Sequence, residues 1–97
     1  MYVSITRCDT SESADEAGPL VGEEMDSWLR ALEGYRGLMV VTRGDETLGL
    51  AFWDTEELAQ RHAELRKSFR ERMLTLADVR ILGVDGYDVA FSRVELT

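Results

Sequence analysis

Two neighbouring segments that are apolar on both sides place the strongest limit on how this chain folds. "YRGLMVVTR" (35–43) and "TLGLAFWD" (47–54) both read as β-strands, and the Gly44-Asp45-Glu46 connection between them is typical of a hairpin. Successive side chains of a strand point to opposite faces of its sheet, and here apolar residues point both ways. Both faces of the sheet are therefore expected to be covered. Helices can cover one face, and a second copy of the chain is the simplest cover for the other.

The N-terminal part of the chain predicts a strand followed by a helix. Residues 2–8 are rich in β-branched and aromatic residues and read as a strand, whereas the polar, acidic residues 9–18 read as a loop. A helix is predicted near 19–33, with Pro19 in its first turn and Gly34 at its C-terminal end. Its apolar residues fall on one helical face: Val21, Met25, Trp28, Leu29 and Leu32.

A second helix is predicted from about 55 to 73. Asp54 and Glu57 fit a capping box, in which the Asp54 side chain accepts a hydrogen bond from the amide of Glu57. One face of this helix carries Leu58, His62, Leu65, Phe69 and Met73. Its acidic residues come early and its basic residues late, which agrees with the helix dipole. The basic end is expected to lie opposite the acidic first helix as a solvated surface.

The end of the chain completes a known arrangement of elements. Residues 87–95 predict a strand, and residues 79–84 predict either a short strand joined to it through Asp85-Gly86 or an extended connection. The order strand, helix, strand, strand, helix, strand is that of the ferredoxin-like α+β fold, a four-stranded antiparallel sheet with two helices on one face. The chain is short enough to be a single domain, 1–97, and dimerisation through the sheet would cover its second apolar face.

The composition excludes several classes of partner. A net charge of −8 disfavours nucleic acid and anionic membranes, because both require a basic surface. Cys8 is the only cysteine, so an internal disulfide and a Cys-rich zinc site are excluded. We expect no bound metal and a structural role for Cys8. No signal-peptide pattern opens the sequence and no apolar run is long enough to span a bilayer, so a cytoplasmic protein is the expectation.

Two motifs resemble a known group of proteins. "GYRG" (34–37) opens the second strand, and "FWDTEEL" (52–58) ends the third strand in tryptophan and begins a capped helix. With the element order, these motifs are similar to those of the dimeric α+β barrel proteins of the antibiotic-biosynthesis-monooxygenase type. That group includes cofactor-independent monooxygenases acting on polycyclic phenols, haem-degrading enzymes and small dimers of unknown role. The resemblance therefore implies a fold and a homodimer more firmly than a reaction.

The resemblance also points to two residues. Trp53 matches a tryptophan that faces a cavity between sheet and helices, where an indole can stack on a flat aromatic molecule. His62 resembles the helix-borne histidine that holds iron in the haem-degrading branch. Both enzyme branches, however, use an asparagine that this chain lacks, and Gly49 stands four residues before Trp53, where the monooxygenases carry it. A site without this group has lost a main means of polarising its substrate.

Three hypotheses follow. The first is a dimer that binds a small aromatic molecule in a cavity lined by Trp53, His62, Phe52 and Tyr87, without a bound cofactor. If it is an enzyme, it inserts oxygen into an electron-rich aromatic substrate. The second is a haem-binding protein with His62 as the axial ligand. The third is a non-catalytic dimer in which Trp53 and His62 are core residues.

The sequence allows two interpretations of the role of Arg7. Near a strand end its guanidinium could bind a carboxylate or phenolate through two hydrogen bonds. Alternatively, it forms an ion pair with one of the seven acidic residues between it and Arg30.

Overall fold

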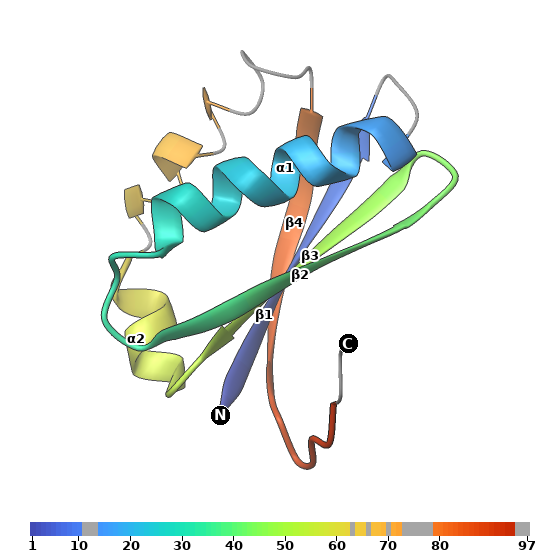
Figure 1. Cartoon of the computed structure of the whole chain (residues 1–97). Coiled ribbons are helices and arrows are strands. Elements are labelled where there is room, and N and C mark those ends of the chain that lie inside the picture. Colours follow the sequence, from blue (N-terminus) through green and yellow to red (C-terminus); the bar gives the residue numbers. More distant parts are fainter. Residues whose placement is uncertain (11–13, 63, 66, 70, 73–78, 95–97) are drawn as a thin grey trace.

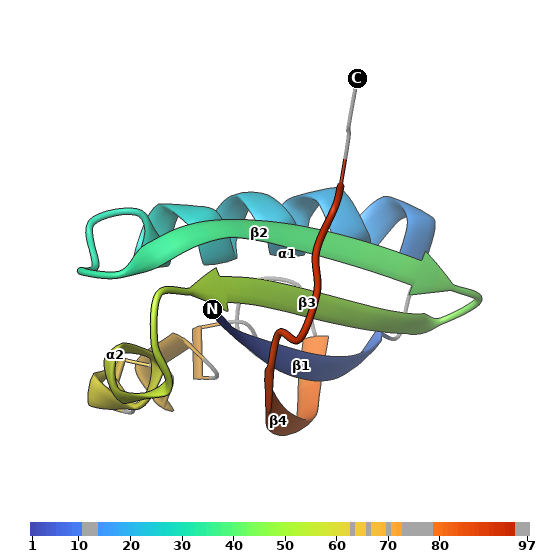
Figure 2. The same cartoon turned by 90° about the horizontal axis from the view of Figure 1, so that it is seen from below.

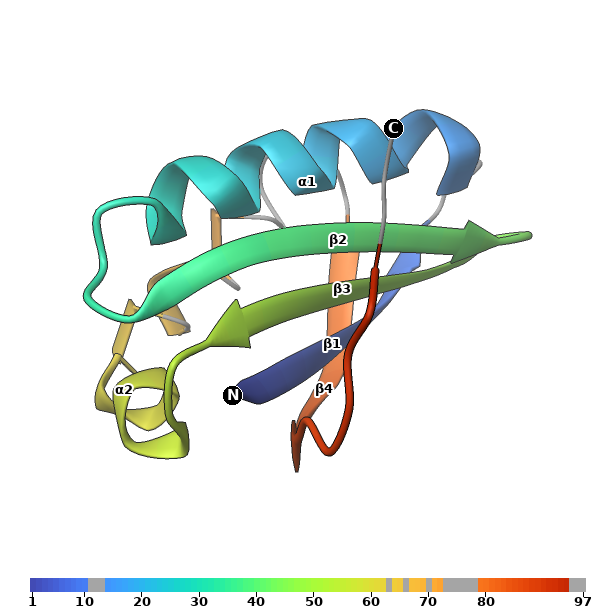
Figure 3. The same ribbon diagram turned by 60° about the horizontal axis from the view of Figure 1, so that its bottom comes forward.

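The computed structural model describes residues 1–10, 14–62, 64–65, 67–69, 71–72 and 79–94. Its elements are β1 (Tyr2–Thr10), α1 (Ala14–Leu29), β2 (Tyr35–Arg43), β3 (Glu46–Trp53), α2 (Glu56–Arg61) and β4 (Val79–Asp88), in this order (Figure 1). The strands form one antiparallel sheet in the order β2-β3-β1-β4. α1 lies along one face of this sheet, and α2 follows the end of β3 (Figure 3). The predicted α+β class and element order are confirmed.

The first strand and first helix differ from the predicted boundaries. β1 continues to Thr10 and α1 begins at Ala14, so most of the loop expected over 9–18 is strand or helix, and residues 11–13 lie outside the described part. The polar composition was misleading here, because a helix can extend beyond its buried apolar stripe. α1 ends at Leu29 and Pro19 lies inside it, so the predicted range of 19–33 is wrong at both ends.

α2 begins one residue later than the capping box predicts. The N-cap is Thr55, whose hydroxyl accepts a hydrogen bond from the amide of Leu58 at 3.2 Å. Asp54 is instead paired with Arg36. His62 is the C-cap of α2, and residues 64–65, 67–69 and 71–72 are again helical. Residues 63, 66, 70 and 73 of the predicted helix lie outside the described residues.

β4 corrects the prediction for the end of the chain. The strand covers Val79–Asp88, so the alternative of a strand at 79–84 is confirmed, whereas the strand expected at 87–95 is present only as far as Asp88, and residues 95–97 are not described. β4 pairs with β1 as far as Tyr2↔Asp88, and the Val89 amide donates to the Met1 carbonyl at 2.9 Å. Beyond this bond, the described residues 90–94 have no strand partner among the described residues.

The strand register gives the two faces of the sheet different characters. On the face toward the helices, the neighbouring rows are Leu38–Ala51–Ser4–Gly86, Val40–Gly49–Thr6–Val84 and Thr42–Thr47–Cys8–Ile81. On the other face, called the open face below, the rows are Gly37–Phe52–Val3–Tyr87, Met39–Leu50–Ile5–Asp85 and Val41–Leu48–Arg7–Gly83. The two central strands thus carry small residues toward the helices and large apolar residues toward the open face.

The core lies between the helices and the small-residue face. From α1, Val21 is fully buried and Met25 is 6% exposed, and both pack with Cys8, Phe69 and Val79. Each such apolar side chain contributes about 1.5–3 kcal/mol when it leaves water. Burial raises the pKa of the Cys8 thiol to about 11, which keeps it neutral at physiological pH. No helix among the described residues is long and apolar enough to cross a membrane.

Candidate functional site

A small cavity lies between α1 and the sheet. Its volume is about 40 Å³, and it exists because the central strands carry only short side chains beneath the helix. Its walls are Ser4, Thr6, Met25, Trp28, Leu29, Ala51, Trp53, Leu65, Phe69, Ile81 and Val84. Three of these residues are aromatic, two carry hydroxyl groups, and none of the described wall residues carries a charge. The chemistry of the walls suits an uncharged aromatic molecule.

Trp53 is held firmly at one side of the cavity. Its side chain is 4% exposed, and its indole Nε1 donates a hydrogen bond to the Ser4 hydroxyl at 3.2 Å. The Tyr35 ring meets it edge-on, with the ring centroids 5.7 Å apart. Tyr35 is fixed in turn, because its hydroxyl donates to Asp26 Oδ1 at 2.9 Å. Burial, followed by this bond to Asp26, raises the pKa of Tyr35, so its hydroxyl stays protonated.

Trp28, on α1, is fixed at another side of the cavity. Its Nε1 donates to Glu24 Oε1 at 3.1 Å, and its ring meets Phe69 edge-on at a centroid distance of 6.1 Å. Arg72 Nε also donates to Glu24 Oε1, at 3.2 Å. The hydrogen bonds from Trp28 and then Arg72 lower the pKa of Glu24. The Arg72–Glu24 pair confirms, for one contact, that the basic end of the second helical region faces the acidic first helix.

His62 lies beside Trp53 but outside the cavity walls. The two rings stack at a centroid distance of 6.1 Å and an interplanar angle of 27°. His62 is partly buried, and its Nε2 atom is shielded from solvent without a hydrogen-bond partner among the described residues. His62 was expected to line the cavity, but it is not one of the described wall residues.

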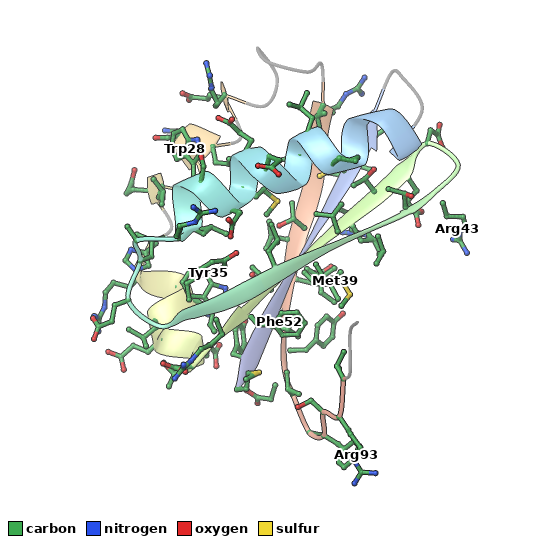
Figure 4. The ribbon with its side chains drawn as sticks, viewed as in Figure 1. Trp28, Tyr35, Met39, Arg43, Phe52 and Arg93 are labelled. Atoms are coloured by element: carbon green, nitrogen blue, oxygen red, sulfur yellow. The ribbon has the colours of Figure 1, made fainter. Side chains whose placement is uncertain are left out.

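The other expected site residues lie on the open face. Phe52 and Tyr87 flank Val3 there, and Tyr87 is 55% exposed, so neither shares the cavity as expected. Figure 4 shows Phe52 and Met39 on the side of the sheet away from α1. Because side chains alternate along a strand, Phe52 cannot face the same side as Trp53. Arg7 also lies on the open face, where it pairs at 3.6 Å with Asp85, an acidic residue of β4 and not of the segment before Arg30.

Haem does not fit this site. A cavity of about 40 Å³ holds about one water molecule, far less than a porphyrin needs. The Nε2 atom of His62, which would have to meet the iron, is covered by protein. Among the described residues there is also no cluster of three or more His, Cys, Asp or Glu side chains placed to hold a metal ion.

Several cavity residues escaped the sequence reasoning. They are all the wall residues except Trp53: Ser4, Thr6, Met25, Trp28, Leu29, Ala51, Leu65, Phe69, Ile81 and Val84. A usable signal was present, because small residues recur at every second position of both central strands. Small residues side by side on two neighbouring strands leave an unfilled space wherever large side chains from a helix do not reach the sheet.

Comparisons with known proteins bear on the fold. The sequence matches no protein-family model and no curated protein sequence. The structure is similar to a proposed antibiotic biosynthesis monooxygenase from Deinococcus radiodurans, with a TM-score of 0.66 and 16% identity over the whole of both chains. A second proposed antibiotic biosynthesis monooxygenase, from Nitrosomonas europaea, gives a TM-score of 0.64 and 15% identity over 94% of this chain and 100% of the other.

A third solved structure is also similar to this chain. Rv0793 from Mycobacterium tuberculosis gives a TM-score of 0.58 and 13% identity over 97% of this chain and 100% of the other. At these identities the likeness concerns the fold. The chain therefore has the fold of the antibiotic-biosynthesis-monooxygenase-like proteins.

Proposed function

We propose that this chain binds a small, uncharged aromatic molecule in the cavity between α1 and the sheet. The observation that carries the proposal is the set of walls: Trp28, Trp53 and Phe69 surround a space bordered by the hydroxyl-bearing residues Ser4 and Thr6. Aromatic rings contact such walls by edge and face, and hydroxyl groups supply the few polar contacts that orient a ligand. The fold shared with proposed antibiotic biosynthesis monooxygenases supports the same assignment.

The proposed reaction is oxygen insertion into an electron-rich aromatic substrate without a cofactor. The substrate supplies the electrons, one atom of O₂ enters it as a carbonyl oxygen, and the other atom leaves as water. The protein's part is to position the substrate and to remove a proton from it. The described cavity walls contain no titratable side chain, so the proton acceptor is not one of the described wall residues.

We further propose that the protein acts as a homodimer joined through the open face. This face is apolar over β2, β3 and much of β1, apart from the Arg7–Asp85 pair, and it leaves Val41 40% and Tyr87 55% exposed. Figure 2 shows residues 89–94 passing in front of the same face, and this segment exposes Phe91 and Val94. A continuous apolar surface of this kind is typical of an interface, and a second copy presents a matching one.

A phenolic ligand is the direct test of binding. We expect p-cresol to quench tryptophan fluorescence and to raise the melting temperature, because a ligand that binds only the folded state stabilises it by about 2.7 kcal/mol at one hundred times its Kd. Trp53→Phe should weaken binding, whereas Met39→Leu on the open face should not. The proposed reaction predicts oxygen uptake with an electron-rich phenol. If no phenol changes either signal, Trp53 and His62 are core residues only.

A charge on the open face tests the dimer. Leu50 lies between Met39 and Ile5 in the middle row of this face, so Leu50→Asp would bury a carboxylate without a partner at the proposed interface. We expect the dimer dissociation constant to rise at least about 100-fold, measured by sedimentation equilibrium. Leu20→Asp, at an exposed leucine of α1, is the control and should remain dimeric. A wild-type protein that is monomeric at high concentration would refute the assembly.

A further inference from the structure

We propose that Met25 is a displaceable side chain that closes the cavity and limits it to ligands with a single aromatic ring. The inference rests on the proposed binding function. A ligand would occupy the space that the Met25 thioether now fills, above Gly49. Neither the fold nor the neighbouring structures assign such a role to this position.

The position of the thioether is the first observation. A Cβ atom placed on Gly49 would lie 3.1 Å from Met25 Sδ and 3.4 Å from Cε, so the end of the methionine rests almost directly on the β3 backbone. The same point is 4.0 Å from Thr6 Cβ. Met25 therefore fills the hollow that the missing side chain at position 49 leaves, next to the Thr6 wall of the cavity.

The second observation is the size of the space. The cavity is about 40 Å³, whereas an apolar cavity of about 150 Å³ is enough to hold a benzene ring. A wall must therefore move before even one ring can enter. The displaced methionine still takes up part of this space, so its withdrawal opens room for one ring and not for a polycyclic molecule.

The third observation is that hydrogen bonds and ring contacts hold the aromatic walls, whereas Met25 is held by apolar packing in the core. Trp28 is bonded to Glu24 and packs against Phe69, and Trp53 is bonded to Ser4. Met25 is unbranched, with three rotatable side-chain bonds, and it can leave its position without moving α1. Its sulfur also makes favourable contacts with aromatic rings, so it can remain against the ligand that displaces it.

Matched variants test the role of Met25, with p-cresol as the probe and isothermal titration calorimetry as the readout. Met25→Ala removes the closing group, and we expect it to bind p-cresol at least tenfold more tightly than the wild type. Val21→Ala is the control, because Val21 is buried one turn earlier on α1 but does not line the cavity. It should bind like the wild type. A two-ring probe, 1-naphthol, should bind Met25→Ala and not the wild type.

A second variant leaves α1 untouched. Gly49→Ala places a methyl group where the thioether rests, and the flexible Met25 can yield by a few tenths of an ångström, so the protein should fold. We expect its affinity for p-cresol to fall at least threefold. Equal binding of p-cresol by the wild type, Met25→Ala and Gly49→Ala would overturn the role of Met25 and leave the binding function standing. Absence of binding in Met25→Ala, where the space is open, would overturn both.

Discussion

Replacing Trp53 by alanine is expected to lower the free energy of unfolding by about 3–5 kcal/mol, the usual cost of deleting a buried tryptophan side chain. The indole is 4% exposed and packs with Ala51 and Ala59 in the core near α2. Its removal leaves a void and deprives the Ser4 hydroxyl of its donor. Domains of this size have a total stability of only about 5–15 kcal/mol, so the loss is readily measured by urea denaturation.

Trp53→Phe separates the two parts of this effect. Phenylalanine keeps an aromatic ring against Tyr35 but has no N–H to donate, so we expect a loss of about 1–3 kcal/mol from the unpaired Ser4 hydroxyl and the smaller ring. The denaturation midpoint should therefore be lowest for Trp53→Ala, intermediate for Trp53→Phe and highest for the wild type. A midpoint for Trp53→Ala within experimental error of the wild type would show that this ring does not pack in solution as described.

Replacing Gly34 by alanine is expected to cost about 2–5 kcal/mol, for two separate reasons. Gly34 has φ +85°, a conformation that costs an alanine roughly 1–2 kcal/mol. In addition, the new Cβ would lie 2.4 Å from Leu58 Cδ1 and 3.0 Å from Leu58 Cβ, so the base of that side chain and α2 must shift, at about 1–3 kcal/mol. The backbone cannot move away freely, because the Gly34 carbonyl accepts the Asp54 amide at 2.9 Å.

Gly44→Ala is the matched control for Gly34→Ala. Gly44 also has a positive φ, of +64°, but its added Cβ would meet no atom within 4 Å. This variant should lose only the free energy of unfolding that an alanine costs at a positive φ. The difference between the two variants, measured by urea denaturation, reports the packing of Leu58 against the turn. Equal losses in both would contradict that contact.

The sequence predicted best those features that depend on the residues of a single helix or strand. Alternation along 35–43 and 47–54 predicted which side chains share a face, and the register confirms that both faces are apolar. The helix boundaries were less accurate, since the turn of α1 that begins at Ala14 has no apolar periodicity to reveal it. The strand predicted at 87–95 is wrong beyond Asp88: its alternating pattern is suitable, but the pairing of β4 with β1 stops at Tyr2↔Asp88.

The candidate site was only partly predictable, because a cavity depends on residues that meet across elements. Trp53 was found from its place at a strand end, and His62 from its place on a helical face. Met25 and Trp28 were recognised only as core residues, since nothing local shows that they lie above Gly49 and Thr6. The position of Gly49 beside Thr6 follows from the pairing of β1 with β3, which joins residues far apart in the sequence.

The sheet order has a consequence for how the chain is assembled during synthesis. β1 is made first but lies between β3 and β4, so both of its hydrogen-bonding edges wait for segments made later. One edge stays open until residue 53 is available, and the other until residue 88. Such distant pairings slow folding, because the chain must close long loops before any contact rewards it. On the ribosome this domain can complete its sheet only when almost all of it has been released.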